Sequence, residues 1–321
     1  MTSVTSLIKE RIIERGKISF AEFMEMALYH PELGYYTSPR VTVGPEGDFY
    51  TSPATHPVFA ALIAIQLDQM WRLLGSPKPF TLVEMGAGKG LLGREILAYV
   101  AHHSPALADA VQYVGLERRR MWAVKGQESW PKHPVSREAD WGRLSANGIT
   151  GCVVSNELLD ALPTHKVVQK DGRLKEAYIT LRDGRFVETV DELSTPLLET
   201  QLLDEGISLP EGHSTEVNLN LGLWVRDVAK RLQRGFVITF DYGYPARELY
   251  SPARAQGTIM TYYQHTYGTD PYLRIGEQDI TSHVDFTAVI LAGERNGLHF
   301  WGFLSQRDFL LNLGLDTFIE A

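Results

Sequence analysis

The stretch Phe80-Thr-Leu-Val-Glu84-Met-Gly86-Ala-Gly88-Lys-Gly90 decides the fold of this chain. An apolar run meets an acidic residue and three alternating glycines, and a helical pattern follows from Leu91 to Val100. Glycine lets the backbone turn tightly and approach a ligand without interference from a Cβ atom, and a new helix presents free N–H groups at its start. We therefore expect a strand, loop and helix that bind a nucleotide-type cofactor.

The spacing within this loop indicates which cofactor it binds. The dinucleotide fingerprint is G-x-G-x-x-G, whereas this loop has G-x-G-x-G with the carboxylate of Glu84 two residues before the first glycine. A carboxylate in the turn would repel a pyrophosphate and would suit the amino group and sulfonium of S-adenosylmethionine (SAM). Glu84, Gly86, Gly88 and Gly90 are therefore predicted cofactor residues, and the alternative is a glycine-rich turn without a ligand.

A second predicted cofactor residue lies about thirty residues further on. Val111-Gln-Tyr-Val-Gly-Leu-Glu117 is a short apolar strand that ends in a carboxylate. In doubly wound folds an acidic side chain at the end of the second strand bonds the ribose hydroxyls. Glu117 is our predicted ribose ligand.

Composition limits the class of protein. The chain has 321 residues, a net charge of −8 and a pI near 5.7, which disfavour broad nucleic-acid binding. The single cysteine, Cys152, excludes a disulfide framework or a cysteine zinc site, and we expect a core residue and no metal site. No stretch is apolar enough to cross a bilayer and the N-terminus lacks a signal-peptide core, so we expect a cytoplasmic protein. The oligomeric state does not follow from the sequence.

The pattern along the chain predicts an α/β fold with a Rossmann-like parallel sheet, which the resemblance given below identifies as a class I methyltransferase sheet. Residues 1–75 are expected to form a helical N-terminal cap with a loop on the substrate side. Alternating strands and helices in 76–165 and 221–321 predict the parallel sheet of a SAM-binding core. Two Asp-Gly turns within 166–220 predict an antiparallel β-meander inserted into that core.

Two further strand ends carry polar side chains. Asn156, Glu157 and Asp160 follow the apolar run Gly151–Ser155, and Asp241 and Tyr242 follow another apolar run that ends at Phe240. Ligands of open α/β sheets bind at the carboxyl ends of the strands, so we expect these side chains to gather at one edge with Glu84 and Glu117. Each has a structural alternative, such as a helix cap for Asn156 or a turn for Asp241.

Several segments together resemble the MidA-like family of SAM-dependent methyltransferases over nearly the whole chain. They are Asp48-Phe49-Tyr50-Thr51-Ser52-Pro53, Glu84 to Gly90, Asn156-Glu157-Leu-Leu-Asp160-Ala-Leu-Pro163, Asp241-Tyr242-Gly243 and Asp279-Ile-Thr-Ser-His283-Val-Asp285-Phe286. The resemblance implies a class I methyltransferase with SAM as cofactor. Mitochondrial members of that family are assembly factors of respiratory complex I that methylate an arginine of one subunit, which implies a protein substrate, such as a respiratory-complex subunit.

The loop from His30 to Pro53 is either a functional wall or lid or a merely packed loop. As a wall it would bind the substrate through Asp48, Thr51 and Ser52, together with Asp241 and Tyr242. Ala54 follows Thr51-Ser52-Pro53 where the family commonly has an acidic residue, which weakens the case for an arginine substrate. The chain also stops at Ala321, where longer members continue towards a final strand.

The predicted catalytic residues depend on the methyl acceptor. A guanidinium acceptor needs carboxylates that hold it and favour loss of its proton, and Glu157 and Asp160 would share one face if their segment is helical. A hydroxyl acceptor needs a general base, for which His283 beside Asp285 is the candidate. We assign Asn156 to the cofactor.

These patterns favour a SAM-dependent methyltransferase that acts on a protein side chain, most simply an arginine nitrogen. One alternative is an O- or N-methyltransferase of a small molecule, which Ala54 in place of an acid would permit. The other is a SAM-binding assembly factor with little catalysis, which the acidic surface and the long insertion fit.

Overall fold

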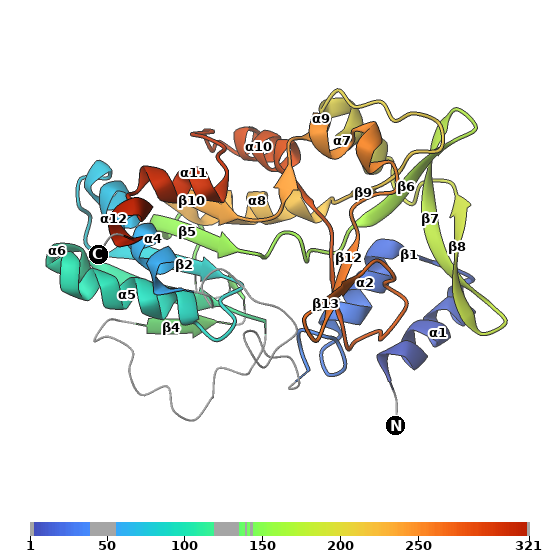
Figure 1. Cartoon of the computed structure of the whole chain (residues 1–321), viewed down its shortest axis with the longest axis horizontal. Coiled ribbons are helices and arrows are strands. Elements are labelled where there is room, and N and C mark those ends of the chain that lie inside the picture. Colours follow the sequence, from blue (N-terminus) through green and yellow to red (C-terminus); the bar gives the residue numbers. More distant parts are fainter. Residues whose placement is uncertain (1–2, 39–55, 119–134, 139, 142–143, 320–321) are drawn as a thin grey trace. The chain divides into compact units, whose positions relative to one another are not determined.

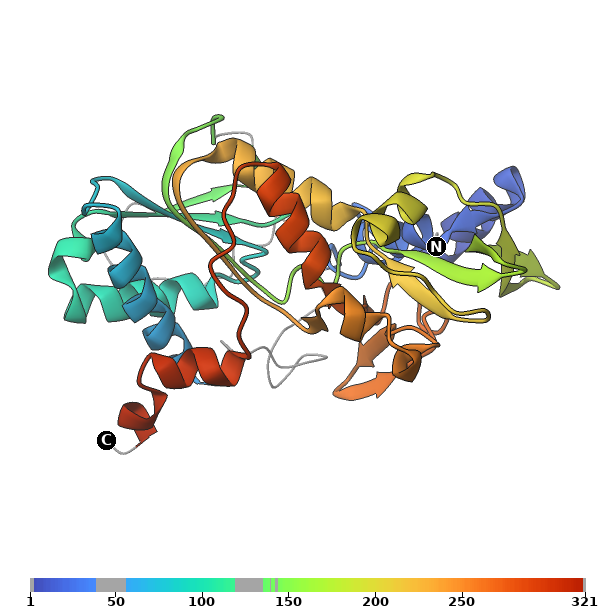
Figure 2. The ribbon, with the colours of Figure 1, turned by 90° about the horizontal axis from the view of Figure 1, so that it is seen from above.

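The computed structural model describes residues 3–38, 56–118, 135–138, 140–141 and 144–319 (Figures 1 and 2). Its contacts divide the chain into two compact units. The loop unit consists of Tyr50–Leu158, Asp227–Phe240 and His299–Ala321 and contains the glycine loop. The meander unit consists of Met1–Phe49, Leu159–Arg226 and Asp241–Leu298.

A parallel sheet is the centre of the loop unit. Its strands are β2 (Phe80–Met85), β3 (Val111–Leu116), β4 (Val135–Glu138), β5 (Ile149–Asn156) and β10 (Leu232–Phe240), in the order β10-β5-β2-β3-β4. Every neighbouring pair is parallel. Phe240 pairs with Asn156, and Met85 pairs with both Ser155 and Leu116, so these strands end at one edge of the sheet. The prediction of a parallel α/β sheet is confirmed.

Helices pack on one face of this sheet, and the side chains between helices and sheet form the core of the unit. α4 (Pro57–Leu73) packs on α5 (Leu91–His103), and the short helices α6 (Pro105–Ala108), α11 (Gln306–Asn312) and α12 (Leu315–Ile319) complete the unit. Phe59 and Ile63 of α4 share a buried cluster with Leu82 and Cys152 of the sheet. Cys152 is fully buried, and burial raises the pKa of its thiol far above the ordinary value. Cys152 is thus a core residue, as expected.

An antiparallel sheet organises the meander unit. It contains β1 (Ile18–Ser19), β6 (His165–Lys170), β7 (Arg173–Arg182) and β9 (Ser214–Val217) in the order β1-β7-β6-β9, with β8 (Arg185–Asp191) also paired to β7. Asp171-Gly172 joins β6 to β7 and Asp183-Gly184 joins β7 to β8. All four residues have positive φ angles between 51° and 74°, which the tight turns of two-residue hairpins require.

The two N-terminal helices belong to this unit. α1 (Val4–Arg15) and α2 (Phe20–Tyr29) bury Ile8 and Phe23 in one cluster with Ile179 of β7. The sequence Ser19-Phe-Ala-Glu22 is a capping-box pattern, which predicts a helix start at Ser19. Ser19 is the N-cap of α2, and its hydroxyl accepts a hydrogen bond from the Glu22 N–H at 3.1 Å. The contact units therefore differ from the predicted segments, since α1 and α2 pack on the meander while α4 packs on α5.

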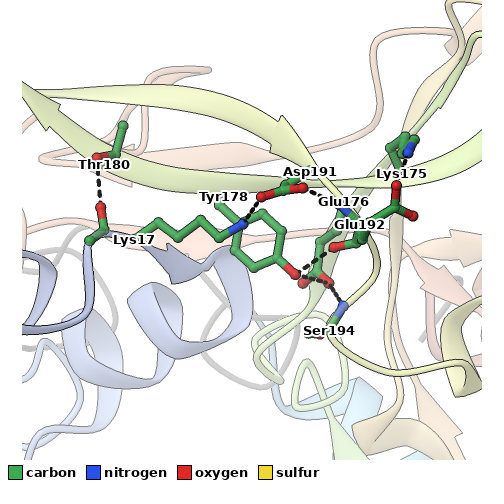
Figure 3. A network of polar contacts seen from close by, with 9 residues as sticks. Lys17, Lys175, Glu176, Tyr178, Thr180, Asp191, Glu192 and Ser194 are labelled. Atoms are coloured by element: carbon green, nitrogen blue, oxygen red, sulfur yellow. Dashed lines mark hydrogen bonds and ion pairs between the residues drawn. The ribbon is translucent and has the colours of Figure 1, made fainter.

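A polar network ties the residues after α1 to the meander (Figure 3). Lys17 forms an ion pair with Asp191 at the end of β8, and its ammonium lies 3.9 Å from the ring centroid of Tyr178. The Thr180 hydroxyl donates to the Gly16 carbonyl at 2.8 Å. Tyr178 in turn donates to the carboxylate of Glu176 at 3.2 Å. These contacts hold the α1–β1 connection against β7.

Three helices and further short strands complete the meander unit. The helices are α7 (Leu197–Asp204), α9 (Ala246–Leu249) and α10 (Phe286–Arg295), and α8 (Asn220–Arg231) leads into β10. The strands are β11 (Gly243–Tyr244), β12 (Met260–Tyr263), β13 (Thr266–Gly268), β14 (Asp279–Thr281) and β15 (Val284–Asp285), with a 3-10 turn, η2, at Pro252–Arg254. β11 and β15 pair in parallel, which brings the predicted Asp241 and His283 segments side by side. In the part of the chain that the structure describes, none of the helices has the length and apolar character to span a membrane.

Candidate functional site

The glycine loop of the loop unit has the geometry that its sequence predicts. It connects β2 to α5, and Gly86, Gly88 and Gly90 have φ angles of 67°, 51° and 73°. These are left-handed conformations, which residues with a Cβ atom rarely adopt. Gly90 is the N-cap of α5 and offers no side-chain cap. The loop therefore needs glycine at each of the three positions for its backbone alone.

The first two glycines of the loop differ in the space around them. A Cβ atom on Gly86 would lie 2.9 Å from the Cδ1 atom of Leu158, so packing fills the space there. Among the described residues, a Cβ atom on Gly88 would meet nothing within 4 Å. Since the Gly88 backbone faces open space, a ligand can approach it closely.

Glu84 anchors the loop through one of its two carboxylate oxygens. Its Oε2 atom accepts hydrogen bonds from the Gly93 N–H at 2.9 Å and from the Tyr113 hydroxyl at 2.5 Å. Gly93 is in the first turn of α5, so Glu84 supplies the cap that Gly90 lacks. Oε1 receives no hydrogen bond from the described residues and remains available for the predicted contact with the cofactor. Burial raises the pKa of Glu84 to about 7, although the bonds from Tyr113 and Gly93 oppose that rise.

Gly93 and Tyr113 are positions that sequence reasoning missed. A Cβ atom on Gly93 would lie 2.2 Å from the Tyr113 ring and 2.7 Å from Glu84 Oε2, so only glycine fits in this turn of the helix. The available signal was a glycine inside an amphipathic helix pattern, which has a conformational cost and therefore usually has a packing reason.

Glu117 meets the glycine loop, as the cofactor prediction requires. It follows β3, and its Oε2 atom accepts a hydrogen bond from the Gly88 N–H at 2.8 Å. The Glu117 backbone N–H donates to the Glu138 carbonyl at 2.9 Å, which fixes the end of β3 beside β4. The two predicted parts of the cofactor site are thus adjacent, and the ribose contact itself stays a prediction.

Asn156 and Glu157 end β5 at the same edge of the sheet. The Oδ1 atom of Asn156 is buried and has no hydrogen-bond partner among the described residues, while its Nδ2 group donates to Glu157 Oε1 at 3.3 Å. Glu157 has a φ angle of 49°, which is rare for a residue with a side chain. Such strained positions concentrate at functional sites, and the buried oxygen of Asn156 is a site for a ligand donor.

The segment after Glu157 does not form the helix on which its predicted pairing with Asp160 depended. Residues 158–162 form turns, with the Leu162 N–H donating to the Leu159 carbonyl at 3.2 Å. The positive φ of Glu157 prevents a continuous right-handed helix from starting there. The prediction that Glu157 and Asp160 share one face of a helix is therefore wrong. Their catalytic roles stay predictions.

The meander unit brings three predicted segments together around Asp160. Asp241 accepts hydrogen bonds from the Leu159 N–H at 2.8 Å and from the Tyr242 N–H at 2.9 Å. The Ser282 N–H donates to the Asp160 carbonyl at 2.9 Å, and the Val284 N–H donates to the Tyr242 carbonyl at 2.8 Å. The structure therefore joins, within one unit, residues that lie 42 (284 − 242), 82 and 122 (282 − 160) positions apart in the chain.

His283 has the surroundings of a neutral base. Its Nδ1 atom is buried and has no hydrogen-bond partner among the described residues. The centroid of its ring lies 5.4 Å from that of Tyr244. The guanidinium of Arg254 lies over the same tyrosine ring, 3.8 Å from its centroid. Burial, and then the charge of Arg254, lower the pKa of His283 below its ordinary value. The imidazole is therefore uncharged at neutral pH.

Asp285 is the N-cap of α10. One oxygen accepts from the Ala288 N–H at 3.1 Å and the other from the Tyr250 hydroxyl at 2.9 Å. In the described structure its carboxylate bonds these two groups and not the imidazole of His283. His283 and Asp285, which were predicted to act as a pair, are not hydrogen-bonded to each other. A catalytic role of Asp285 stays a prediction, and an experiment must distinguish it from the role of Asp285 as a helix cap.

Tyr36 and Asp279 are further members of this cluster that sequence reasoning did not single out. The Tyr36 hydroxyl donates to Asp279 Oδ1 at 2.7 Å, and its ring stacks on Tyr29 with centroids 5.4 Å apart. Burial first, and then the charges of Asp279 and other neighbours including Asp160, raise the pKa of Tyr36. The only signal was the aromatic loop that contains Tyr36 and the start of the motif that contains Asp279.

Some predicted residues fall outside the described structure. Asp48, Thr51 and Ser52, predicted to bind the substrate, are among them, as is Ala54. Tyr242 is described and is 58% exposed. Over the described ranges, no group of three or more His, Cys, Asp or Glu side chains could hold a metal ion.

The loop unit has the arrangement of an α/β enzyme that binds a nucleoside cofactor at the carboxyl ends of parallel strands. Residues 62–304 match a family described as S-adenosyl-L-methionine-dependent methyltransferases. The chain belongs to this family of SAM-dependent methyltransferases, which is the MidA-like family that its motifs resemble.

Relatives and solved structures agree with this assignment. "Protein arginine methyltransferase NDUFAF7 homolog, mitochondrial" from Drosophila melanogaster is 30% identical, and the match covers 99% of this chain and 76% of that protein. The mouse protein of the same type is 26% identical over 97% of this chain and 74% of its own length. A crystal structure from Burkholderia thailandensis bound to S-adenosyl-homocysteine has a TM-score of 0.88 and 31% identity, covering 99% of this chain and 82% of that one. The protein is a methyltransferase and its cofactor is SAM.

The residues of the loop unit fit this cofactor. Three features lie at the ends of β2, β3 and β5: the space at Gly88, the carboxylate of Glu117 and the Asn156 oxygen, which has no hydrogen-bond partner among the described residues. When bound, SAM supplies a methyl group on a sulfonium, which already carries its leaving-group activation. The protein must mainly align the acceptor with that group and exclude water.

Proposed function

We propose that this methyltransferase transfers its methyl group to a protein side chain, an arginine nitrogen. The observation that carries the proposal is a cluster in the meander unit that contains the buried carboxyl groups of Asp160 and Asp279 and the partly buried phenol of Tyr36. Carboxylates can form bidentate hydrogen bonds with a guanidinium and favour the loss of its proton. The names of the relatives, protein arginine methyltransferases, support the same acceptor.

In this proposal the chain's own groups divide the work. Asp241 fixes the turn before Asp160 through the Leu159 N–H, and Ser282 fixes Asp160 through its carbonyl. Asp160 and Glu157 then accept hydrogen bonds from the guanidinium and one of them receives its proton. The helices α1 and α2 and the meander would be additions to a class I methyltransferase core that recognise the protein acceptor. A respiratory-complex subunit is the acceptor that the family resemblance suggests. A cytoplasmic location stays a prediction from the sequence, which has no membrane-spanning stretch and no signal-peptide core.

One observation favours a second candidate, an O- or N-methyltransferase of a small molecule. His283 is neutral and its Nδ1 atom lacks a partner among the described residues, so it could accept a proton from a hydroxyl. In that case His283→Asn should abolish turnover and Glu157→Gln should not.

Transfer of a labelled methyl group to a cell lysate tests the acceptor class. A discrete labelled protein supports the proposal, and its modified residue is then identified by mass spectrometry. Label in a small molecule supports the second candidate. No transfer, with SAM bound, would indicate an assembly factor with little catalysis.

Once the acceptor is identified, Glu157→Gln tests the role of the carboxylate in turnover, because glutamine keeps the shape of the side chain and removes its charge. Turnover should fall strongly while SAM affinity changes less than about tenfold, or about 1.4 kcal/mol. Wild-type turnover at saturating SAM would remove this carboxylate from the mechanism. Loss of SAM binding with intact turnover per bound cofactor would place Glu157 in the cofactor site instead.

A further inference from the structure

The carboxylates of the proposed acceptor cluster are buried, so a protein side chain must reach them from the surface. Asp160 and Asp279 are 8% and 3% exposed. Asp279 belongs to β14, which pairs with β12, and β12 forms a hairpin with β13 (Figure 1). The tip of that hairpin, residues 264–267, is exposed. This three-stranded sheet therefore connects the cluster to the surface of the meander unit.

One row of side chains crosses the sheet from Asp279 to the surface. Tyr262 of β12 lies directly opposite both Asp279 of β14 and Tyr267 of β13. Residues directly opposite each other in an antiparallel sheet share a face, and two such steps cover about 10 Å between Cα atoms. Tyr262 is half-buried and Tyr267 is 79% exposed. The row thus runs from a buried carboxylate, over two tyrosines, into solvent.

The turn of the hairpin fixes this row. Gln264 and His265 join β12 to β13 as a two-residue loop, with φ angles of 46° and 59°. Positive φ angles at both positions are those of a type I′ turn, which matches the twist of the two strands and sets their register. Tyr262 and Tyr267 are therefore held on one face, although the hairpin is exposed.

The chemistry of this face suits an arginine side chain. The faces of tyrosine rings attract cations, and the inner end of the row has the Asp279 carboxylate, with Asp160 near the same phenol, Tyr36. The strands β12, β13 and β14 contain no basic residue. Arginine can lay its methylene stem on apolar surface while its charged group reaches a polar one. An acidic side chain would meet like charge at Asp279.

The opposite face of the same hairpin already holds a guanidinium against a tyrosine. Tyr263 follows Tyr262 in β12 and therefore points to the other face of the sheet. The guanidinium of Arg274 lies over its ring, 4.6 Å from the centroid. The cation for Tyr263 thus comes from this chain, whereas most of the Tyr267 side chain faces solvent.

We propose that Tyr262 and Tyr267 bind the acceptor arginine of a protein substrate, with its stem along the two rings and its guanidinium at Asp279. The assignment rests on the proposed function, because it takes the acid cluster as the place of the acceptor. The two rings then select a cationic side chain and take no part in the transfer of the methyl group itself.

A matched pair of peptides tests this surface with the full-length protein and S-adenosyl-homocysteine. The probes are acetyl-Gly-Ser-Gly-Arg-Gly-Ser-Gly-amide and the same peptide with citrulline, a neutral isostere, in place of arginine. We expect the arginine peptide to bind at least about fivefold more tightly. The NMR ring resonances of Tyr262 and Tyr267 should shift during the titration, and those of Tyr263 should not.

Substitutions of Tyr267 separate the ring from its hydroxyl. Tyr267→Leu removes the aromatic face and should weaken the arginine peptide about two- to fivefold, whereas Tyr267→Phe keeps that face and should bind like wild type. Tyr263→Leu is the matched control, because it removes a tyrosine from the opposite face of the same hairpin, and it should keep the affinity. Melting curves show that each variant is folded.

Methyl transfer gives a second measurement once the labelled acceptor protein is identified. Tyr267→Leu should raise the KM for that acceptor about two- to fivefold and leave kcat unchanged. The variant loses binding that the substrate and the transition state share, and such a loss appears in KM alone. Tyr263→Leu should keep both constants.

Equal affinities of the two peptides for wild type would overturn the proposal, as would equal losses in Tyr267→Leu and Tyr263→Leu. Self-association that Tyr267→Leu abolishes would assign the row to a second copy of the chain and would also overturn it. Label on an arginine with an unchanged KM in Tyr267→Leu would overturn the tyrosine row and keep the proposed function. Label on a small molecule alone, with the expected peptide results, would refute the proposed acceptor and keep the row as an arginine-binding surface.

Discussion

At the scale of single residues, the glycine loop combines a backbone requirement with space for a ligand. Gly86, Gly88 and Gly90 all have left-handed φ angles. The surroundings of the first two differ: Leu158 packs against Gly86, whereas the space beside Gly88 is open among the described residues. The open side of Gly88, next to the Glu117 carboxylate, is where a substitution should affect the cofactor rather than the fold.

Gly88→Val should abolish the binding of SAM and S-adenosyl-homocysteine. The valine side chain would fill the open space, and its left-handed backbone would cost about 1–2 kcal/mol. Isothermal titration calorimetry measures the binding. Gly172→Val is the matched control, because Gly172 has a φ of 73° and equal open space in a turn of the other unit. It should lose similar stability and keep the affinity; unchanged binding in Gly88→Val would contradict the cofactor site.

Glu117→Ala should weaken SAM by about 1.5–3 kcal/mol, the usual range for hydrogen bonds to a charged group. The variant removes the predicted ribose ligand and leaves the Gly88 N–H without its partner. Calorimetric titration again gives the affinity. Glu211→Ala is the control, since its carboxylate also accepts from turn N–H groups, those of Asp171 and Gly172, in the meander unit. Equal SAM affinity in Glu117→Ala would show that the ribose is held elsewhere.

At the scale of elements, two junctions depend on buried carboxyl groups in different ways. Glu84 joins β2 to the first turn of α5, and Asp285 joins β15 to α10. Glu84 has a pKa that burial raises, whereas Asp285 is bonded by a helix N–H and a phenol. Substitution by an amide therefore tests the two junctions in different ways.

The Glu84 junction should make the protein less stable as the pH rises. Its pKa is about 7 in the folded state and 4.5 as the reference value, so across that window the unfolded chain releases a proton that the folded chain keeps. The free energy of unfolding should then fall with rising pH, by about 3 kcal/mol in total from this group. Urea denaturation of wild type and Glu84→Gln at about pH 4 and about pH 8 measures the difference.

Wild type should lose more stability than Glu84→Gln between these two conditions, because glutamine does not titrate. Its amide oxygen can still accept from the Gly93 N–H and the Tyr113 hydroxyl. Parallel pH dependences of the two proteins would show that Glu84 titrates as an ordinary carboxyl group.

Asp285→Ala should destabilise the protein by about 2–4 kcal/mol, because it removes a helix cap and leaves the buried Tyr250 hydroxyl unpaired. Asp285→Asn keeps an oxygen for the Ala288 N–H and should be closer to wild type in denaturant unfolding. Turnover of the folded Asn variant then separates the two roles. Full turnover would make Asp285 a structural residue, and a large loss with native stability would support its predicted catalytic role.

At the scale of the whole molecule, the chain combines a parallel sheet unit with an antiparallel meander unit, and only the first contains the predicted cofactor residues Glu84 to Gly90, Glu117 and Asn156. Binding of S-adenosyl-homocysteine should therefore protect one unit directly.

At about one hundred times its Kd, S-adenosyl-homocysteine should stabilise the native protein by about 2.7 kcal/mol and raise its melting temperature. Hydrogen exchange should slow most in peptides that contain Gly86–Gly90, Glu117 and Asn156. The hairpins β6–β7 and β7–β8 are the internal control and should change least. Protection confined to the hairpins would place the cofactor outside the predicted site.

The sequence by itself determined the local features. A strand, three glycines and a helix follow from a pattern within one short stretch, because the φ angles of glycine and the apolar periodicity are local properties. The same holds for the turns Asp171-Gly172 and Asp183-Gly184, and for the cap of α2 by Ser19. Position in the pattern also placed Glu117 beside the loop, because adjacent parallel strands end at the same edge.

Only the tertiary structure decided which atoms those side chains meet. Glu84 bonds Tyr113 and Gly93, Asp285 caps α10 and bonds Tyr250, and Tyr36 bonds Asp279 across 243 positions of chain. Sequence reasoning paired Asp285 with His283 because they are neighbours, and it paired Glu157 with Asp160 through a helix that does not form. Hydrogen bonds between distant segments depend on packing, and a single sequence contains no local signal for them.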